Sequence, residues 1–206
     1  MSRSGEIIAQ LRSDYPDAHC ELDYGTPFEL LVAVILSAQC TDKRVNIVTK
    51  SLFEKYNTPY DFACMEQEKL EELIHSCGFF RAKARSIISA SRDILEKFGG
   101  EVPSTMEDLL TLRGVGRKTA NVVLAVAFGE STIAVDTHVF RTAHRLGLSD
   151  KPTPEGVERD LVAAFDEEDR SVAHHLLIFH GRYRCHSQRP ECDGCSLYDY
   201  CVYGKE

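Results

Sequence analysis

The sequence of 206 residues lacks long hydrophobic segments, and no run of 18 or more apolar residues occurs in it. A membrane-spanning helix is therefore not expected. The first residues, MSRSGEIIAQLRSDYP, lack the apolar block of a secretory signal peptide. Internal repeats, low-complexity segments and obvious linkers are also missing. These absences predict a globular, cytoplasmic protein of one or two domains, whose eight cysteines are mostly reduced or metal-bound.

Acidic residues are missing from three windows, residues 73–92, 109–129 and 171–190, although the formal net charge of the chain is −8. A negative net charge by itself argues against a nucleic-acid-binding protein. Segregated charges, however, can form a basic face on an acidic body. Chance fluctuation of charge along the chain is the alternative. We expect weak DNA affinity that falls steeply with salt concentration.

Strand signals are few, whereas helical periodicity recurs along the whole chain, so the predicted fold class is all-α. Pro27 is predicted to begin a buried helix, and Asp42 to be the N-cap of the next one. Ser104 with Glu107 reads as a capping box at the start of a further helix. Other helices are expected at about residues 7–15, 70–78, 84–98, 137–146, 154–165 and 170–182.

The stretch LRGVGRKTANVVLAVAF, residues 112–128, combines two glycines with a helix that is apolar on nearly every side. Such a helix belongs in a core. Its first turn nevertheless carries cations, which the field of a helix N-terminus disfavours. These cations are Arg113, Arg117 and Lys118.

Two functions would explain these cations, and a plain glycine turn with solvated charges is the alternative. Gly114 and Gly116 would let backbone N–H groups approach an anion closely, and phosphate is the usual ligand of such a turn. Lys118, close to other cations and to a positive helix end, would lose its proton more easily. A deprotonated lysine is a nucleophile that can form a Schiff base.

LRGVGRKTA, followed by VDTHVFR at residues 135–141, closely resembles the endonuclease III family of DNA glycosylases. The resemblance covers most of the chain. It implies a two-lobed helix-hairpin-helix glycosylase fold, with a six-helix lobe at residues 22–132. A discontinuous helical lobe, residues 1–21 and 133–206, would then carry an iron–sulfur cluster loop at 185–201.

The resemblance also implies a reacting pair. Lys118 matches the amine that attacks the sugar C1′ in bifunctional enzymes of this family, whereas the related adenine glycosylases lack a lysine there. Asp136 matches a carboxylate that stabilises positive charge on the sugar and accepts a proton from the lysine. Asp136 could also be only the N-cap of a helix that begins at Thr137, and the two roles are compatible. His138 is expected to be a packed histidine.

Several DNA-binding residues follow from the same resemblance. Gln39, in LSAQCTD, would fill the gap left by a flipped base; without the resemblance it would read as a polar loop residue. Phe79, after Gly78, would be an apolar wedge between base steps, although leucine is common in the family at this position. Phe80 is expected in the core. The remaining predicted DNA contacts are Leu112, Gly114, Val115, Gly116 and Arg117 in the hairpin, and Arg189 in the cysteine loop.

Cys185, Cys192, Cys195 and Cys201 lie within 17 residues in the spacing C-x6-C-x2-C-x5-C. Four thiols this close in a cytosolic chain indicate metal ligands rather than disulfides. Zinc and an iron–sulfur cluster both accept four cysteines. The resemblance favours the [4Fe-4S] cluster of endonuclease III enzymes.

Taken together, the sequence predicts a base-excision-repair DNA glycosylase that removes oxidised pyrimidines and cleaves the abasic site by β-elimination through a lysine Schiff base. A mismatch glycosylase of the same superfamily is one alternative. A non-catalytic helix-hairpin-helix DNA-binding module with a structural metal is another. We expect a monomer acting on double-stranded DNA with a damaged base or abasic site, in a bacterial or archaeal cytoplasm, associated with the nucleoid.

Overall fold

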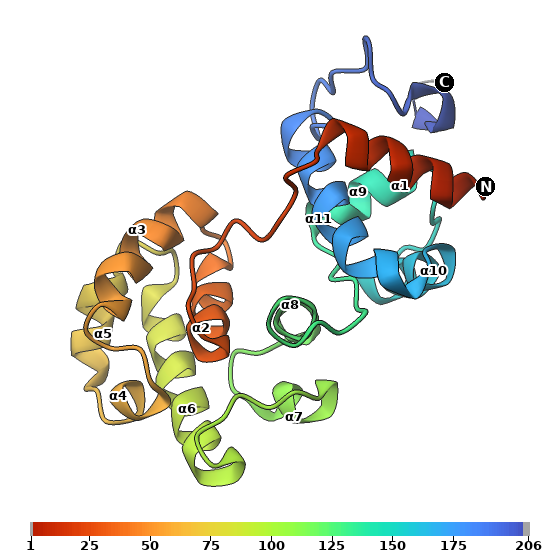
Figure 1. The fold of residues 1–206 in the computed structure, drawn as a ribbon. Coiled ribbons are helices and arrows are strands. Elements are labelled where there is room, and N and C mark those ends of the chain that lie inside the picture. Colours follow the sequence, from red (N-terminus) through yellow and green to blue (C-terminus); the bar gives the residue numbers. More distant parts are fainter. Residues whose placement is uncertain (1, 204–206) are drawn as a thin grey trace. The chain divides into compact units, whose positions relative to one another are not determined.

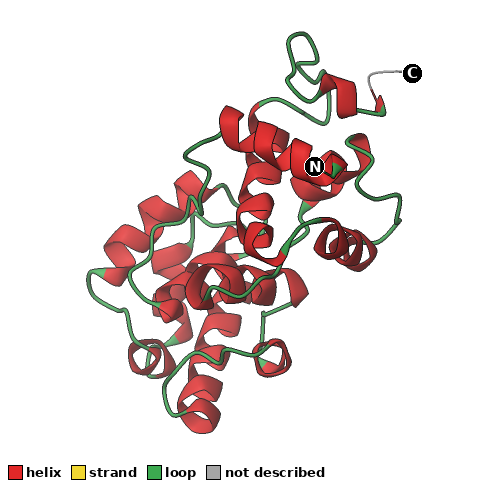
Figure 2. Ribbon diagram, turned by 45° about the vertical axis from the view of Figure 1, so that its right-hand side comes forward, coloured by secondary structure: helices red, strands yellow, loops and turns green. Residues whose placement is uncertain are grey.

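The computed structural model of the protein describes residues 2–203, and this part of the chain is helical with no β-strand (Figures 1 and 2). The predicted all-α fold class is confirmed. The chain divides into two compact units. We call Glu21–Phe128 the hairpin unit, and Met1–Cys20 together with Gly129–Glu206 the cysteine-loop unit. None of the helices within residues 2–203 is long and apolar enough to cross a membrane.

The hairpin unit is built around α2, which packs against α3, α6 and α8. Every residue of α2 from 28 to 36 is buried, as expected for a helix without a polar face. Pro27 occupies its first turn, as predicted. The helices of this unit are α2 Pro27–Ser37, α3 Asp42–Phe53, α4 Pro59–Ala63, α5 Gln67–Ile74, α6 Phe80–Phe98, α7 Met106–Thr111 and α8 Arg117–Phe128.

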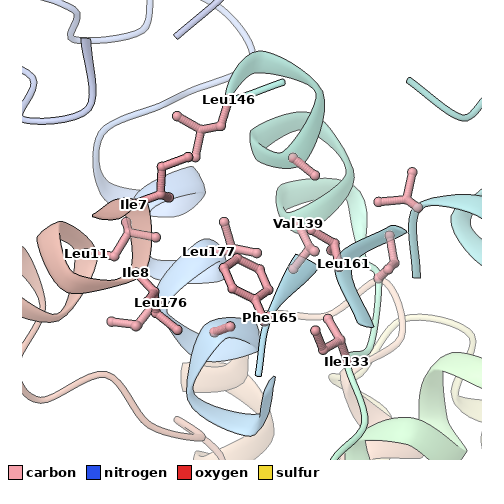
Figure 3. Close-up of a cluster of buried hydrophobic side chains, with 14 of the residues drawn as sticks. Ile7, Ile8, Leu11, Ile133, Val139, Leu146, Leu161, Phe165, Leu176 and Leu177 are labelled. Atoms are coloured by element: carbon pink, nitrogen blue, oxygen red, sulfur yellow. The ribbon is translucent and has the colours of Figure 1, made fainter. Parts of the chain in front are cut away.

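The cysteine-loop unit joins the first helix of the chain to its last ones. Its elements are α1 Arg3–Asp14, α9 Thr137–Arg145, α10 Pro154–Ala164, α11 Glu167–Tyr183 and the short 3-10 helix η1 Tyr198–Tyr200. Ile7 and Leu11 of α1 share a core with Val139 of α9 and Leu177 of α11 (Figure 3). Burial of these apolar side chains is what holds the N-terminal helix to the C-terminal part of the chain.

Two predicted helix starts are wrong by one residue. The N-cap of α3 is Thr41 rather than Asp42, and the N-cap of α7 is Thr105 rather than Ser104. Adjacent residues of capping type are equally suitable by chemistry. The N-cap is then the residue from which the helix can bury its apolar face. In α7 the buried residue of that face is Leu109.

Helix α4 was not predicted from the sequence. This five-residue helix begins after a capping box in which Thr58 and Asp61 satisfy each other's backbone groups, and Pro59 occupies its first turn. A helix this short has too few residues to show hydrophobic periodicity, so only its cap could have indicated it.

α9 and α11 approach closely at Gly181. A Cβ atom at this position would lie 2.9 Å from Cβ of His138. Nδ1 of His138 lies 3.3 Å from a terminal nitrogen of Arg141. His138 is therefore a packed residue of the helix interface, as predicted.

Candidate active site and DNA-binding surface

The hairpin connects α7 to α8 through a tight turn. The backbone N–H of Val115 donates to the carbonyl of Leu112 over 3.1 Å, and Gly114 has a φ of +85°. A Cβ atom at Gly114 would lie 2.6 Å from Cβ of Ser86 in α6. Glycine is therefore required here both by the backbone conformation and by the closeness of α6.

The apolar residues of the hairpin turn inward. Leu112 is 2% exposed and Val115 is 6% exposed. Their backbone N–H groups are already used inside the turn, since that of Leu112 donates to the carbonyl of Leu109 and that of Val115 to the carbonyl of Leu112. Gly116, by contrast, is exposed at the start of α8 and would leave open space around an added Cβ atom. The N–H groups of Gly114 and Gly116 donate to no other described residue, so the hairpin can offer these two to a phosphate, as helix N-termini do.

Lys118 is exposed in the first turn of α8. Its ammonium group has no hydrogen bond or ion pair with any residue in the described range 2–203. Most lysines that serve stability are paired or lie along a solvated helix face. A cation in the first turn of a helix is instead slightly unfavourable, so the fold itself gives no reason for Lys118 at this position.

Asp136 is the N-cap of α9, as one of its two predicted roles required. Oδ1 accepts hydrogen bonds from the backbone N–H groups of His138 and Val139, each at 2.8 Å. The second carboxylate oxygen makes no hydrogen bond to another described residue. The cap thus holds the carboxylate in one orientation and leaves one oxygen for a ligand.

Among residues 2–203, three residues other than glycine have a positive φ: Gln39, Phe79 and Arg189. Their φ angles are 54°, 58° and 52°. The left-handed conformation costs about 1–2 kcal/mol for a residue with a Cβ atom. Such strain is typically found at functional sites. These are also the three predicted side-chain contacts to DNA outside the hairpin.

The turns that carry Gln39 and Phe79 lie next to each other in the hairpin unit. A Cβ atom at Gly78 would be 3.2 Å from the carbonyl oxygen of Gln39. Gln39 is exposed, and Phe79 is 72% exposed at the start of α6. Phe80 is only half-buried and does not belong to the buried core, so its predicted place there is wrong. Two strained, exposed side chains thus project from adjacent turns.

Buried Lys83 anchors these turns, a role that the sequence analysis missed. Its Nζ donates to the carbonyl oxygen of Leu36 over 2.8 Å, at the end of α2 and three residues before Gln39. Burial lowers the pKa of Lys83, and it raises the pKa of the neighbouring Cys77 to about 11. A long-range backbone contact of this kind leaves no pattern in the sequence.

The four cysteines of the spacing C-x6-C-x2-C-x5-C line one cavity of the cysteine-loop unit. No three of the His, Cys, Asp or Glu side chains in the described residues converge on a point that could hold a single metal ion. A zinc site would require four sulfur atoms about 2.3 Å from one centre. The four thiols line this one cavity, and such a donor set suits zinc or an iron–sulfur cluster.

Arginines of α9 hold the cysteine loop, and the sequence analysis did not identify them. Arg145 donates to Sγ of Cys185 at 3.3 Å and to the carbonyl of His186 at 2.7 Å. Arg141 donates to the carbonyl of Cys185 at 3.0 Å. Donors to a ligand sulfur are typical outer contacts of metal sites. The signal that could have found these arginines is their spacing of four residues on one helix face.

The sequence profile of the HhH-GPD superfamily base excision DNA repair proteins matches residues 32–167. Endonuclease III of Synechocystis sp. is 51% identical over 200 residues, which cover 97% of this chain and 91% of the relative. Endonuclease III of Escherichia coli is 44% identical over 198 residues, covering 96% and 94%. This chain belongs to the endonuclease III family. The resemblance stated from the sequence is thus confirmed.

Solved structures agree with this membership. A trapped covalent intermediate of an endonuclease III with DNA matches with a TM-score of 0.94 and 48% identity, covering 100% of this chain and 98% of the other. A thermostable thymine-DNA glycosylase shares the fold alone, with a TM-score of 0.89 at 19% identity. As an endonuclease III family member, the protein is a base-excision-repair enzyme, a bifunctional DNA N-glycosylase and abasic-site lyase.

Proposed function

We propose that this endonuclease III family member removes oxidised pyrimidines from duplex DNA, with Lys118 as nucleophile and Asp136 as its partner. The observation that carries the proposal is Lys118 itself. It is exposed in the first turn of α8, behind a glycine turn suited to phosphate, and lacks an internal partner among the described residues. A non-catalytic DNA-binding module could use such a lysine only as a phosphate contact, which would give no covalent complex with an abasic site.

In the proposed reaction the free amine of Lys118 attacks C1′ of the flipped nucleotide, and the base leaves with a proton. The sugar ring opens to an imine. A proton is then lost from C2′ and the C3′–O bond breaks, which cleaves the strand and leaves the phosphate on the 5′ end of the downstream fragment. Water hydrolyses the imine and frees the lysine. The free oxygen of Asp136 accepts the proton of the Lys118 ammonium group and stabilises positive charge on the sugar.

We further propose that the two units are the two lobes of the glycosylase, at residues 22–132 and at 1–21 with 133–206. The hairpin would hold a phosphate through the backbone N–H groups of Gly114 and Gly116, with Arg117 beside it. Leu112 and Val115 would take part by fixing the turn with their buried side chains. Gln39 would occupy the gap of the flipped base, and Phe79 would wedge between base steps. Backbone strain at both residues supports these roles.

We also propose that Cys185, Cys192, Cys195 and Cys201 hold a [4Fe-4S] cluster. Their common cavity and the donor to the Cys185 sulfur support a metal group at this place, and membership of the endonuclease III family supports the cluster rather than zinc. Such a cluster would close the loop and cross-link it to the unit. The loop would then present Arg189 to DNA phosphates, while Arg141 and Arg145 keep its backbone in place.

We propose duplex DNA as the binding partner. Structures of endonuclease III with DNA match this chain throughout its length and support this proposal. We propose that the enzyme acts as a monomer on DNA with a damaged base or an abasic site. The bacterial origin of the relatives supports a cytoplasmic location at the nucleoid.

Borohydride trapping tests the chemistry. Wild-type protein with abasic duplex should give a covalent complex, and Lys118→Gln should give none. Lys50→Gln, another exposed lysine of the hairpin unit, should trap like the wild type. Asp136→Asn keeps a capping side chain but loses the charge, so it should fold normally and slow base removal. Trapping by Lys118→Gln would refute the assignment.

The substrate class and the cofactor need separate measurements. Release of an oxidised pyrimidine from duplex DNA, compared with release from a mismatch, separates the proposed activity from that of a mismatch glycosylase. About four irons and a broad absorption band near ~400 nm would support the cluster. A colourless protein with about one zinc would contradict it.

A further inference from the structure

A hollow of about 490 Å³ in the hairpin unit has no part in the proposed reaction. Its walls come from the connection between α4 and α5, from one face of α6, and from the hairpin turn. Three arginines line it, and we call it the arginine pocket. They are Arg85, Arg92 and Arg113.

The helix geometry of α6 brings two of these arginines to one face. Arg85 and Arg92 are separated by seven residues, and Ile88 and Ser89 between them also line the pocket. This spacing of three, four and seven residues defines one side of an α-helix. Close packing of Gly114 against α6 then places the neighbouring Arg113 beside the same face.

Two of the three arginines of the pocket have no direct partner in the described part of the protein. Arg85 and Arg113 make no hydrogen bond or ion pair with any residue within 2–203. Arg92 makes one contact, from Nε to the carbonyl oxygen of Ala63 at 3.2 Å, which directs its side chain. Unpaired cations on a concave surface focus the electrostatic field and attract anions.

Two carboxylates also line the pocket, and their position has another explanation. Glu66 is the N-cap residue of α5, and Glu68 lies in the first turn of that helix. Acidic residues are stabilising at a helix N-terminus. Neither forms an ion pair with a described arginine. The three arginines therefore leave the pocket with an excess of one positive charge over the two glutamates.

We propose that the arginine pocket binds phosphates of the DNA backbone beyond the hairpin contact, so that α6 extends the footprint of the enzyme on DNA. This inference rests on the proposed function. Seven residues of α-helix span about 10 Å, a length along the duplex axis that holds about three phosphates of one strand. Guanidinium groups suit phosphate because their planar donors can bind two oxygens together.

Arg85→Ala is the decisive variant because Arg85 supports no internal contact, so its removal should leave folding intact. The affinity for a duplex that carries a non-reactive abasic analogue is measured at salt concentrations from about 0.05 to about 1 M, a range wide enough to determine the slope. We expect the slope of log K against log salt to fall by about 0.9, with about tenfold weaker binding at ~0.1 M salt. Trapping at saturating DNA should stay at the wild-type level.

Lys97→Ala is the matched control, because Lys97 lies on the same helix but is paired with Asp93 at 2.5 Å. It should keep the wild-type slope. Arg85→Lys keeps the charge and should recover most of the lost slope. A wild-type slope in Arg85→Ala overturns the proposal, whether or not the affinity changes, because a lost phosphate contact must reduce counterion release.

The failure of this inference is distinguishable from failure of the proposed function. Trapping of Lys118→Gln would refute the chemistry and leave the salt slopes of the Arg85 variants interpretable. Normal trapping chemistry together with an unchanged slope in Arg85→Ala would refute the pocket alone.

Discussion

Gln39→Gly is predicted to make the protein more stable and a poorer enzyme. Gln39 has a φ of 54°, is exposed, and makes no hydrogen bond within the described chain. A residue with a Cβ atom loses about 1–2 kcal/mol in this conformation. Replacement by glycine removes this strain, but the larger conformational entropy of glycine in the unfolded chain costs about 0.5–1 kcal/mol. The free energy of unfolding should therefore rise by about 0.5–1 kcal/mol.

Urea unfolding measures this effect. With an m-value of about 2 kcal/mol/M the midpoint should rise by about 0.3–0.5 M. Gln39→Ala keeps the Cβ atom and the strain, so it should unfold like the wild type. Gln188→Gly, an exposed loop glutamine without a positive φ, should lower the free energy of unfolding by about 0.4–1 kcal/mol.

The affinity for DNA, unlike the stability, should fall in Gln39→Gly. Both Gln39 variants lack the side chain proposed to fill the gap of the flipped base. They should bind an abasic-analogue duplex more weakly than the wild type, and to a similar extent. A Gln39→Gly protein that is less stable than Gln39→Ala would show that the left-handed conformation carries no strain, and our reasoning about all three positive-φ residues would then be wrong.

Three further changes test the supports of the site. Gly114→Ala should cost about 2–4 kcal/mol and weaken DNA binding, because its Cβ atom adds a clash to the backbone strain; Gly129→Ala, with the same sign of φ but open space, should cost less in the same urea assay. Thr58→Ala should lower the free energy of unfolding by about 1 kcal/mol. The Thr58 hydroxyl also donates to the Asp61 carboxylate and lowers its pKa, so this part of the difference between wild type and variant exists above about pH 4 and is lost as the pH falls through the lowered pKa; a difference that stays constant in acid would contradict it. Arg145→Met should lower the affinity of the site for its metal by about 10- to 100-fold, measured as the chelator concentration that removes half of the iron. An unchanged concentration would show that Arg145 does not support the loop.

The helices themselves followed from local patterns. Pro27 begins α2, Gly99 ends α6 with a φ of +63°, and Asp136 caps α9, all as the residue types indicated. Errors arose where neighbouring residues were chemically equivalent, as at Ser104 and Thr105. Local chemistry specifies that a helix starts, but the burial of one particular face specifies at which residue.

The sequence alone determined the fold class, the glycine turn with its lysine, and the four cysteines, because each depends on residues near one another in the chain. Only tertiary packing decided the features that depend on contacts between distant parts of the chain. These are the strained turns at Gln39 and Phe79, the bond from Lys83 to Leu36, and the arginine pocket. A backbone is held in a strained conformation only when its surroundings compensate for the cost, and those surroundings come from residues tens of positions away.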